Sequence, residues 1–442
     1  MLYLKILKYF YMKNKIFHLQ ILFVFVFLFL SESFVFAEFD ENLNVIIKKP
    51  NDKEIEVLGN YKPSYPNTPK VPEYIIKDKH NKFMMAIGGY IRPIFGFDIG
   101  NDLHNILFIP NKIPVPAKKG NKFAYTASPL FSALDYQLIA LPYTENQLTA
   151  YIQLMYIGTG STVMVTDLYI MYRNFFLGRG NTLLYDGASI PVTIDPQGPN
   201  GAAAVTAYRF SYISNVYNGF SFAVGLELPT FDKYTGTYQG KDYPDLNGMQ
   251  YYGDASNPIP DIPAYIQYQG KGLNRIRVSG ILRNFFYRDL IDNETHSVVG
   301  WGAQISGNLQ PFDKLLLYFQ ATYGHGIANY IADLNGKPLS YIPRNDKPGK
   351  MEACPMFGYL GGARYSFTEK LQCNVKFSQA RVWDSGTYYP EYKYGLYTAA
   401  NMFYYITPYL QYGIEYLWGR HKQFTGGGAN ANRIQTTLRF DF

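Results

Sequence analysis

The sequence is poor in cysteine and in charge, and it has no second long apolar run after its N-terminus. Only two cysteines occur among 442 residues, Cys354 and Cys373, which excludes a scaffold held together by many disulfides. Charged residues make up 17% of the chain, against about 25% in ordinary soluble domains. The positive charge is too diffuse for a nucleic-acid-binding surface, and no transmembrane helix is expected beyond residue 37.

Sequence motifs for catalysis and metal binding are also lacking. None of the six histidines forms an H-x-x-x-H or H-E-x-x-H pattern, and no G-x-S-x-G motif occurs. His325 and His421 fall near predicted loop ends, where solvated side chains are expected. We therefore predict that the chain is not an enzyme and uses no cofactor and no metal.

Residues 1–37 have the order of a secretory signal peptide. Lys13 and Lys15 precede an apolar run over 21–30, and a small residue ends the possible cleavage site at 35–37. An uncleaved membrane anchor is the alternative, but the run is short for a spanning helix. Removing this segment lowers the formal net charge from +7 to about +4, because it holds four lysines and one glutamate.

The rest of the chain is rich in aromatic residues and glycine. Aromatic residues reach 17%, with 42 tyrosines, and 39 glycines occur. Residues 38–82 are polar, aperiodic and rich in proline, which predicts a flexible periplasmic segment. From Phe83 onward apolar and polar residues alternate with a period of two, as in "GFSFAVGLELP" (219–229) and "LNRIRVSGILRNFF" (273–286).

Such alternation is compatible with a soluble antiparallel sheet or with a transmembrane barrel that is apolar outside and polar inside. The alternating runs often reach 11–15 residues, against about 5–6 in soluble sheets. Tyr, Phe and Trp cluster at their ends, which is typical of an interfacial girdle. The last alternating run ends on Phe442, like the assembly signal of bacterial outer-membrane barrels. These features favour the barrel.

Turn chemistry divides 83–442 into about 16 strands of one all-β, antiparallel transmembrane barrel, wide enough for an aqueous channel. Short turns are expected on the periplasmic side and longer loops outside. The predicted turns are 142–146, 174–178, 215–219, 270–272, 310–313, 367–370 and 407–408. The predicted loops are 99–124, 158–162, 187–203, 230–262, 287–295, 325–354, 385–393 and 420–430. This places Cys354 and Cys373 at opposite ends of neighbouring strands, so two free thiols are expected.

The alternation assigns most of the arginines to the polar, inward face. The predicted pore-lining residues are Arg92, Asp98, Arg209, Glu227, Arg275, Arg277, Arg283, Arg433 and Arg439, and Arg364, Lys376, Glu415 and Asp441 share their face. A surplus of arginine favours anions in the lumen. The alternative is a structural ladder in which arginines pair with acids, and Arg209 beside Glu227 is expected to be such a pair.

The segment "TIDPQGPNG" (193–201) is a polar knot of turn residues within the third outer loop. In wide porins the third loop commonly folds inward, and the stiffness of a loop with prolines suits a constriction. Asp186, Asp195 and Asn200 are its candidate residues, either as a constriction wall or as a calcium site. The favoured interpretation is loop bracing, with Asp195 accepting backbone N–H bonds in an Asx turn, because a calcium site usually has more clustered carboxylates.

The same region carries a family resemblance. The stretch "FFLGRGNTLLYDGASIPVTIDPQGPNG" resembles the corresponding part of the DcaP-like family of trimeric outer-membrane porins. Further similar stretches are "GLELP" (225–229), "GHGIANYIADL" (324–334) and the closing "GIEYLWGRHKQFTGGGANANRIQTTLRFDF". The resemblance implies a homotrimer of 16-stranded barrels that passes small, often anionic solutes such as dicarboxylates. Family members can carry a periplasmic coiled coil, but residues 38–82 lack heptads.

Two functions remain open from the sequence. The first is an outer-membrane porin, in contact with outer-membrane lipid, for small polar or anionic solutes. The second is a structural or adhesive barrel whose outer loops bind a surface partner or a glycan, for which the tyrosine-rich loop 230–262 is suited. An energised receptor would need a plug domain, and about 45 residues ahead of the barrel are too few.

Overall fold

The computed structural model places most of the chain from Lys82 onward. It describes residues 45–46, 74–77, 82–101, 103, 105–117, 123–157, 162–229, 252–291, 293–344, 347, 349–383 and 392–442. The predicted signal peptide, most of segment 38–82 and most of loop 230–262 lie outside the described residues.

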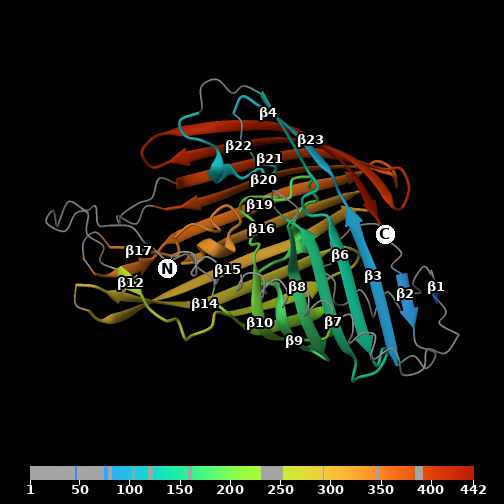
Figure 1. Ribbon diagram of the computed structural model, residues 1–442, viewed down its shortest axis with the longest axis horizontal. Coiled ribbons are helices and arrows are strands. Elements are labelled where there is room, and N and C mark those ends of the chain that lie inside the picture. The colour runs from blue at the N-terminus through green and yellow to red at the C-terminus, as the bar shows by residue number, and fades with distance from the viewer. Residues whose placement is uncertain are drawn as a thin grey trace, which may run out of the picture.

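The described strands form one closed, antiparallel barrel with sixteen strand positions, as predicted (Figure 1). Two positions are occupied by interrupted strands, β3 (Phe83–Ile91) with β4 (Ile94–Ile99), and β5 (Phe123–Ser128) with β6 (Ala133–Ala140). The others are β7 (Leu148–Tyr156), β8 (Val163–Tyr172), β9 (Phe175–Asn181), β10 (Thr206–Ile213), β11 (Phe220–Glu227), β13 (Ile262–Gln269), β14 (Arg275–Asp289), β15 (Thr295–Phe312), β16 (Leu315–His325), β19 (Pro355–Ser366), β20 (Leu371–Val382), β21 (Tyr392–Tyr405), β22 (Leu410–Gln423) and β23 (Gly428–Asp441). Connections alternate between short turns, at the end that holds the C-terminus, and longer loops. We call these ends periplasmic and outer.

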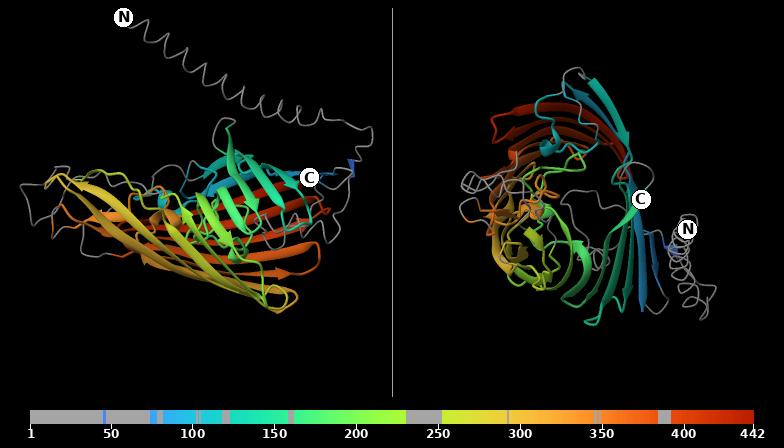
Figure 2. Two further views of the ribbon diagram at one scale, coloured as in Figure 1. Left: turned by 90° about the horizontal axis from the view of Figure 1, so that it is seen from below. Right: turned by 60° about the vertical axis from the view of Figure 1, so that its left-hand side comes forward.

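The last strand closes the barrel on the first. β23 pairs with β4 through Asn432–Thr437, and its end pairs with β3. The backbone N–H and C=O of Phe442 both bond to Gly89, at 3.0 and 2.9 Å. Closure satisfies the strand edges, which lipid cannot do for an open sheet. The right view of Figure 2 shows the wall of strands around the loop segments inside it.

Side chains alternate between an apolar outer face and a polar inner face. On β14, Ile276, Val278 and Leu282 are 42%, 50% and 58% exposed, whereas Ser279 and Arg283 are each 3% exposed. This is the parity predicted from the sequence. Among the described residues, no helix is long and apolar enough to cross a membrane.

The first strand is not continuous, in contrast to the uninterrupted run read from the sequence. It breaks at Arg92 and Pro93, between β3 and β4, since proline has no N–H to donate to a ladder. The N–H of Arg92 instead donates to Ser132 Oγ at 2.9 Å. Two predicted turns are also shorter than expected, because β9 begins at Phe175 and β15 extends to Phe312.

The N-terminal segment contributes two short strands beside the barrel. β2 (Tyr74–Lys77) pairs with β3 from Met84 to Ile87, beyond the point where β23 ends, and β1 (Val45–Ile46) pairs with β2. Both lie alongside β3 in Figure 1. Cys354 and Cys373 are free thiols, as predicted.

Loop residues 182–205 approach the inner side of β19 and β20 at backbone distance. The Gly201 N–H donates to Ser378 Oγ at 2.8 Å. A Cβ on Gly358 would lie closer than 3.0 Å to the backbone of Gly201, and a Cβ on Gly201 would meet the backbone of Tyr359 and Gln379 equally closely. Only glycine permits this contact on both sides.

We predict that Gly358→Ala displaces loop 182–205 and lowers the free energy of unfolding by about 1–3 kcal/mol, the usual range for overpacking. The midpoint of urea unfolding in detergent, followed by tryptophan fluorescence, measures this. Gly361→Ala on the same strand is the matched control, because an added Cβ there has no atom within 4 Å. Equal midpoints for the two variants would contradict the contact.

Candidate functional site: the barrel interior and its loops

The predicted pore-lining residues that belong to strands lie on the inner side of the barrel wall by strand parity, and Arg92 lies at the break between β3 and β4. Most of them form side-chain contacts that the sequence did not predict.

Arg433 on β23 is fully buried and structural. Its guanidinium forms a bidentate ion pair with Asp98, at 2.6 Å to Oδ1 and 2.9 Å to Oδ2. Its other N–H groups donate to the carbonyls of Ile106 and Asn105, each at 2.6 Å. Arg433 therefore fastens residues 105–106 of the first outer loop to the seam where the barrel closes.

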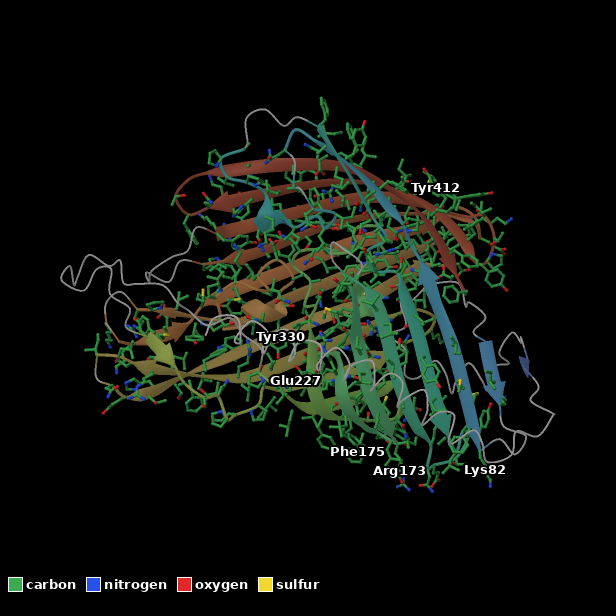
Figure 3. All side chains as sticks on the ribbon, in the orientation of Figure 1. Lys82, Arg173, Phe175, Glu227, Tyr330 and Tyr412 are labelled. Atoms are coloured by element: carbon green, nitrogen blue, oxygen red, sulfur yellow. The ribbon has the colours of Figure 1, made fainter. Side chains whose placement is uncertain are left out.

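Arg283 on β14 is also fully buried. It donates to Asp261 Oδ2 at 3.0 Å and to the carbonyl of Gly326 at 2.6 Å. The Tyr330 hydroxyl donates to Asp261 at 3.1 Å and to Glu227 at 3.2 Å, and burial raises its pKa well above 10. Figure 3 shows Glu227 and Tyr330 near the middle of the molecule, far from Lys82 and Arg173 at its edge.

Arg275 and Arg277 lie side by side on the inner face of β14. Both interact with one carboxylate of loop 182–205, that of Asp186. Arg275 pairs with Asp186, which also accepts from Ser306 Oγ at 2.6 Å. Burial opposes ionisation of Asp186, but the two arginines outweigh it and hold the pKa of that carboxyl below its usual value. Arg277 donates to Gln267 Oε1 and to the Tyr185 carbonyl instead.

Arg209 and Glu227 are direct cross-strand neighbours, as expected from the sequence. Their side chains nonetheless turn to different partners. Arg209 donates to Ser211 Oγ at 3.2 Å and stacks on the Phe176 ring at 3.9 Å. Glu227 accepts from Thr182 Oγ1 at 2.8 Å and from the Leu183 N–H at 2.9 Å, so it holds the start of the loop 182–205.

Two more inward cations, Lys376 and Arg439, lie on β20 and β23. Lys376 pairs with Glu415 at 3.2 Å and donates to the Val192 carbonyl at 2.7 Å. Arg439 pairs with Asp441 at 2.6 Å and lies over the Tyr90 ring at 4.1 Å.

Loop 182–205 is joined to the loop that follows β16 by a short backbone ladder. Ala204, Ala332 and Asp333 donate their N–H groups across it at 2.9–3.0 Å. Asn200 Nδ2 donates to Asp333 Oδ2 at 3.1 Å and to the Gly395 carbonyl at 2.9 Å. Burial raises the pKa of Asp333. The two segments "GPNG" and "IADL", which contributed to the family resemblance, thus contact each other.

Asp195 braces the same loop. Its Oδ1 accepts from the Gln197 N–H at 3.2 Å, which is an Asx turn, and from the Phe108 N–H at 3.1 Å. Its Oδ2 accepts from the Tyr397 hydroxyl at 3.1 Å. Burial raises the pKa of Asp195 to about 7. Over the described ranges, no group of three or more His, Cys, Asp or Glu side chains is arranged to hold a metal ion.

The inward-facing acids are more deeply buried than several of the inward-facing arginines. Nearly all of the acids are buried: Asp98, Asp167, Asp186, Asp195, Glu227, Asp261, Asp333, Glu415 and Asp441. Asp135 is half-buried, and Tyr151 and Gln153 donate to it at 2.9 and 2.7 Å. Arg92, Arg209, Arg277 and Arg439 are half-buried rather than buried. The inward charge that remains accessible on the described part of the wall is therefore mostly positive.

The fold resembles solved outer-membrane channels. The outer membrane channel DcaP of Acinetobacter baumannii is 17% identical with a TM-score of 0.68, and the match covers 83% of this chain and 99% of that one. Outer-membrane expressed OmpT of Vibrio cholerae is 10% identical, with a TM-score of 0.52 over 83% of this chain and 100% of that one. The anion-selective porin from Comamonas acidovorans is 9% identical, with a TM-score of 0.50 over 81% of this chain and 100% of that one.

The fold is that of an outer-membrane porin. No protein-family model and no curated protein sequence matches the chain. The porin fold and the apolar outer face support a location in the bacterial outer membrane. The fold expected from the DcaP-like resemblance is confirmed.

Several residues of the barrel interior were not identified from the sequence. Asp261 and Asp333 hold the loops together, yet each was read only as part of a long loop. The signal was present for Asp333, since it interrupts the apolar run "YIADL". His421 was expected to be solvated and this was wrong: it is 7% exposed, and its Nδ1 lies 2.9 Å from the Ile113 carbonyl inside the barrel.

The raised pKa of Asp195 predicts that the loop is held most firmly in acid. The folded loop binds this proton more tightly than an unfolded chain does, so the stabilisation is complete below about pH 4 and is lost as the pH rises through about 7. Hydrogen exchange of residues 182–205, corrected for intrinsic rates, should show less protection at pH 8 than at pH 5. Asp195→Asn should reduce this difference in protection between the two pH values. Part of the difference should persist, because the pKa of Asp333 is also raised. Equal protection of the wild type at both pH values would contradict the prediction.

Proposed function

We propose that the chain is a porin for small anions, with dicarboxylates as the best-fitting class, and that it works as a homotrimer by likeness to the DcaP-like family. The proposal includes no catalytic step. In it, loop 182–205 narrows the passage, and Arg209 and Arg277 set its charge.

One observation carries the anion preference, namely the unequal exposure of inward charges. The buried acids are occupied by ion pairs and by loop N–H groups, so their negative charge is masked from a solute. The accessible arginines sit in a low-dielectric wall, where a surplus of one sign focuses the potential and raises the local concentration of counter-ions. This asymmetry supports passage of anions.

The region around Tyr265 on β13 suits a carboxylate. Arg277 stacks on the Tyr265 ring at 4.0 Å, and Arg209 stacks on the Phe176 ring at 3.9 Å. The edge of the Arg277 guanidinium donates to Gln267 Oε1 through Nε and Nη2, and a carboxylate that replaced this amide oxygen would form a charge-assisted, bidentate bond in its place. Two such groups on neighbouring parts of the wall match a solute with two carboxylates.

The contacts of loop 182–205 support its role as the constriction. The loop bonds to Arg275 and Ser306 on one part of the wall, and to Lys376, Ser378 and Glu415 on another. A segment held at both places has little freedom to move, which a fixed size limit requires.

The alternative is a structural or adhesive barrel that binds a surface partner or glycan. Most of the loop on which that reading depends, 230–262, lies outside the described residues. Conductance separates the two functions, since a porin must pass ions and an adhesive barrel need not.

We predict that Arg277→Gln lowers the anion-to-cation permeability ratio, by roughly threefold, because it removes an accessible lumen charge. The measurement is the reversal potential of single channels in a planar bilayer under a potassium chloride gradient. Arg209→Gln should act in the same direction. Succinate added to the wild type should block the current, and the block should weaken in Arg277→Gln.

Arg288→Gln is the matched control. Arg288 lies on the same strand but faces outward, where it donates to Asn293, so its loss should leave the reversal potential unchanged. A cation-selective wild type would refute the anion assignment, and folded protein without conductance would favour the adhesive barrel.

A further inference from the structure

The outward face carries a basic patch at the outer ends of two strands, β20 and β22, which flank β21. The patch consists of Arg381 on β20 and of Arg420 and Lys422 on β22. These side chains face outward, because their chain neighbours Ala380, Val382 and His421 are buried on the inner side. The patch is therefore separate from the lumen and from the proposed transport function.

The three cations are close neighbours. Arg381 and Lys422 are both in register with Tyr394 on β21, which lies between them, so they are about 10 Å apart at normal strand spacing. The Arg381 guanidinium is 5.4 Å from the centre of the Tyr394 ring. Lys422 donates to the Gly426 carbonyl, and the Nε of Arg420 is buried without a hydrogen-bond partner.

No carboxylate balances this patch on the described outward face of β20 to β23. The outward neighbours on β23 are Asn430 and Asn432, and Asn432 accepts a bond from the Tyr416 hydroxyl at 2.8 Å. The inner face of the same strands differs, because there Lys376, Arg433 and Arg439 each pair with an acid. The unbalanced charge thus belongs to the side that contacts the membrane.

The residues below the patch on β22 suit acyl chains. Tyr412, Ile414 and Tyr416 face outward and are 43%, 44% and 46% exposed, and Trp418 follows on the same face. Ten residues separate Tyr412 from Lys422, about 34 Å along a strand and about 24 Å vertically at a tilt near 45°. This equals the height of the apolar band of such barrels, about 25 Å, so the cations lie at its outer boundary.

We propose that Arg381, Arg420 and Lys422 bind the phosphorylated sugar headgroup of a glycolipid of the outer leaflet. Guanidinium and ammonium groups bind phosphate through charge-assisted hydrogen bonds. The asparagines and tyrosines beside them offer partners for sugar hydroxyls, and the apolar face of β22 receives the acyl chains. A phosphate free in solution would make no use of that apolar face, so a lipid is the favoured occupant.

The test measures binding of bis-phosphorylated lipid A to the purified full-length barrel in detergent, by native mass spectrometry over a lipid titration. The triple variant Arg381→Gln, Arg420→Gln, Lys422→Gln is expected to bind at least tenfold more weakly than the wild type. Two controls accompany it. Arg381→Lys with Arg420→Lys keeps the charge and should retain most of the binding, and Arg288→Gln removes an outer cation elsewhere and should change nothing.

The possible results separate the proposal from its rivals. Equal binding of dephosphorylated lipid A, or equal binding by the triple variant, would overturn it. Competition by inorganic phosphate alone, with no dependence on acyl chains, would assign the patch to a free anion and also overturn it. A change in oligomeric state of the triple variant without loss of lipid binding would make the patch a contact between copies of this chain. Channel selectivity should be unchanged throughout, which keeps this test independent of the transport proposal.

Discussion

Closure of the backbone hydrogen-bond ladder is the constraint on which the rest of this structure depends. Lipid offers no partner for a free N–H or C=O, so the first and last strands must meet. They do so where β23 joins β4 and where Phe442 pairs with Gly89. Once the sheet is closed, one face of every strand contacts lipid and the other faces the interior of the barrel. The alternation of apolar and polar residues follows from that geometry, and so does the burial of charge inside.

Acidic and basic side chains in the interior differ in burial and in their partners. Carboxylates such as Asp98, Glu227 and Asp261 are buried. They form ion pairs and hydrogen bonds that connect the wall with the loops. Several arginines bind neutral oxygens instead and stay partly exposed, as Arg277 does with Gln267. A buried charge needs a partner to offset desolvation, so the acids serve the structure. The half-buried arginines are the charges on which the proposed passage of anions depends.

The two sides of the wall also serve separate roles. In the proposed functions, the cations inside the barrel affect which solutes pass, and the cations at the outer ends of β20 and β22 bind a lipid headgroup. The loops divide in the same way: 182–205 and the loop after β16 pair with each other inside the barrel, and glycines such as Gly201 and Gly358 allow their close approach to the wall. Two segments that are distant in sequence therefore form one unit.

The sequence by itself determined the barrel, its number of strands, the ends at which its turns and loops lie, and the parity of residues such as Arg277 and Arg283. These features depend on local alternation and turn chemistry, which a single strand already contains. Only the tertiary structure decided the partners: Arg433 with Asp98, Arg283 with Asp261, and Asn200 with Asp333. These pairs join parts of the chain whose distance depends on strand register and on the paths of the loops. Register across sixteen strands is a property of the closed sheet, and no local pattern encodes it.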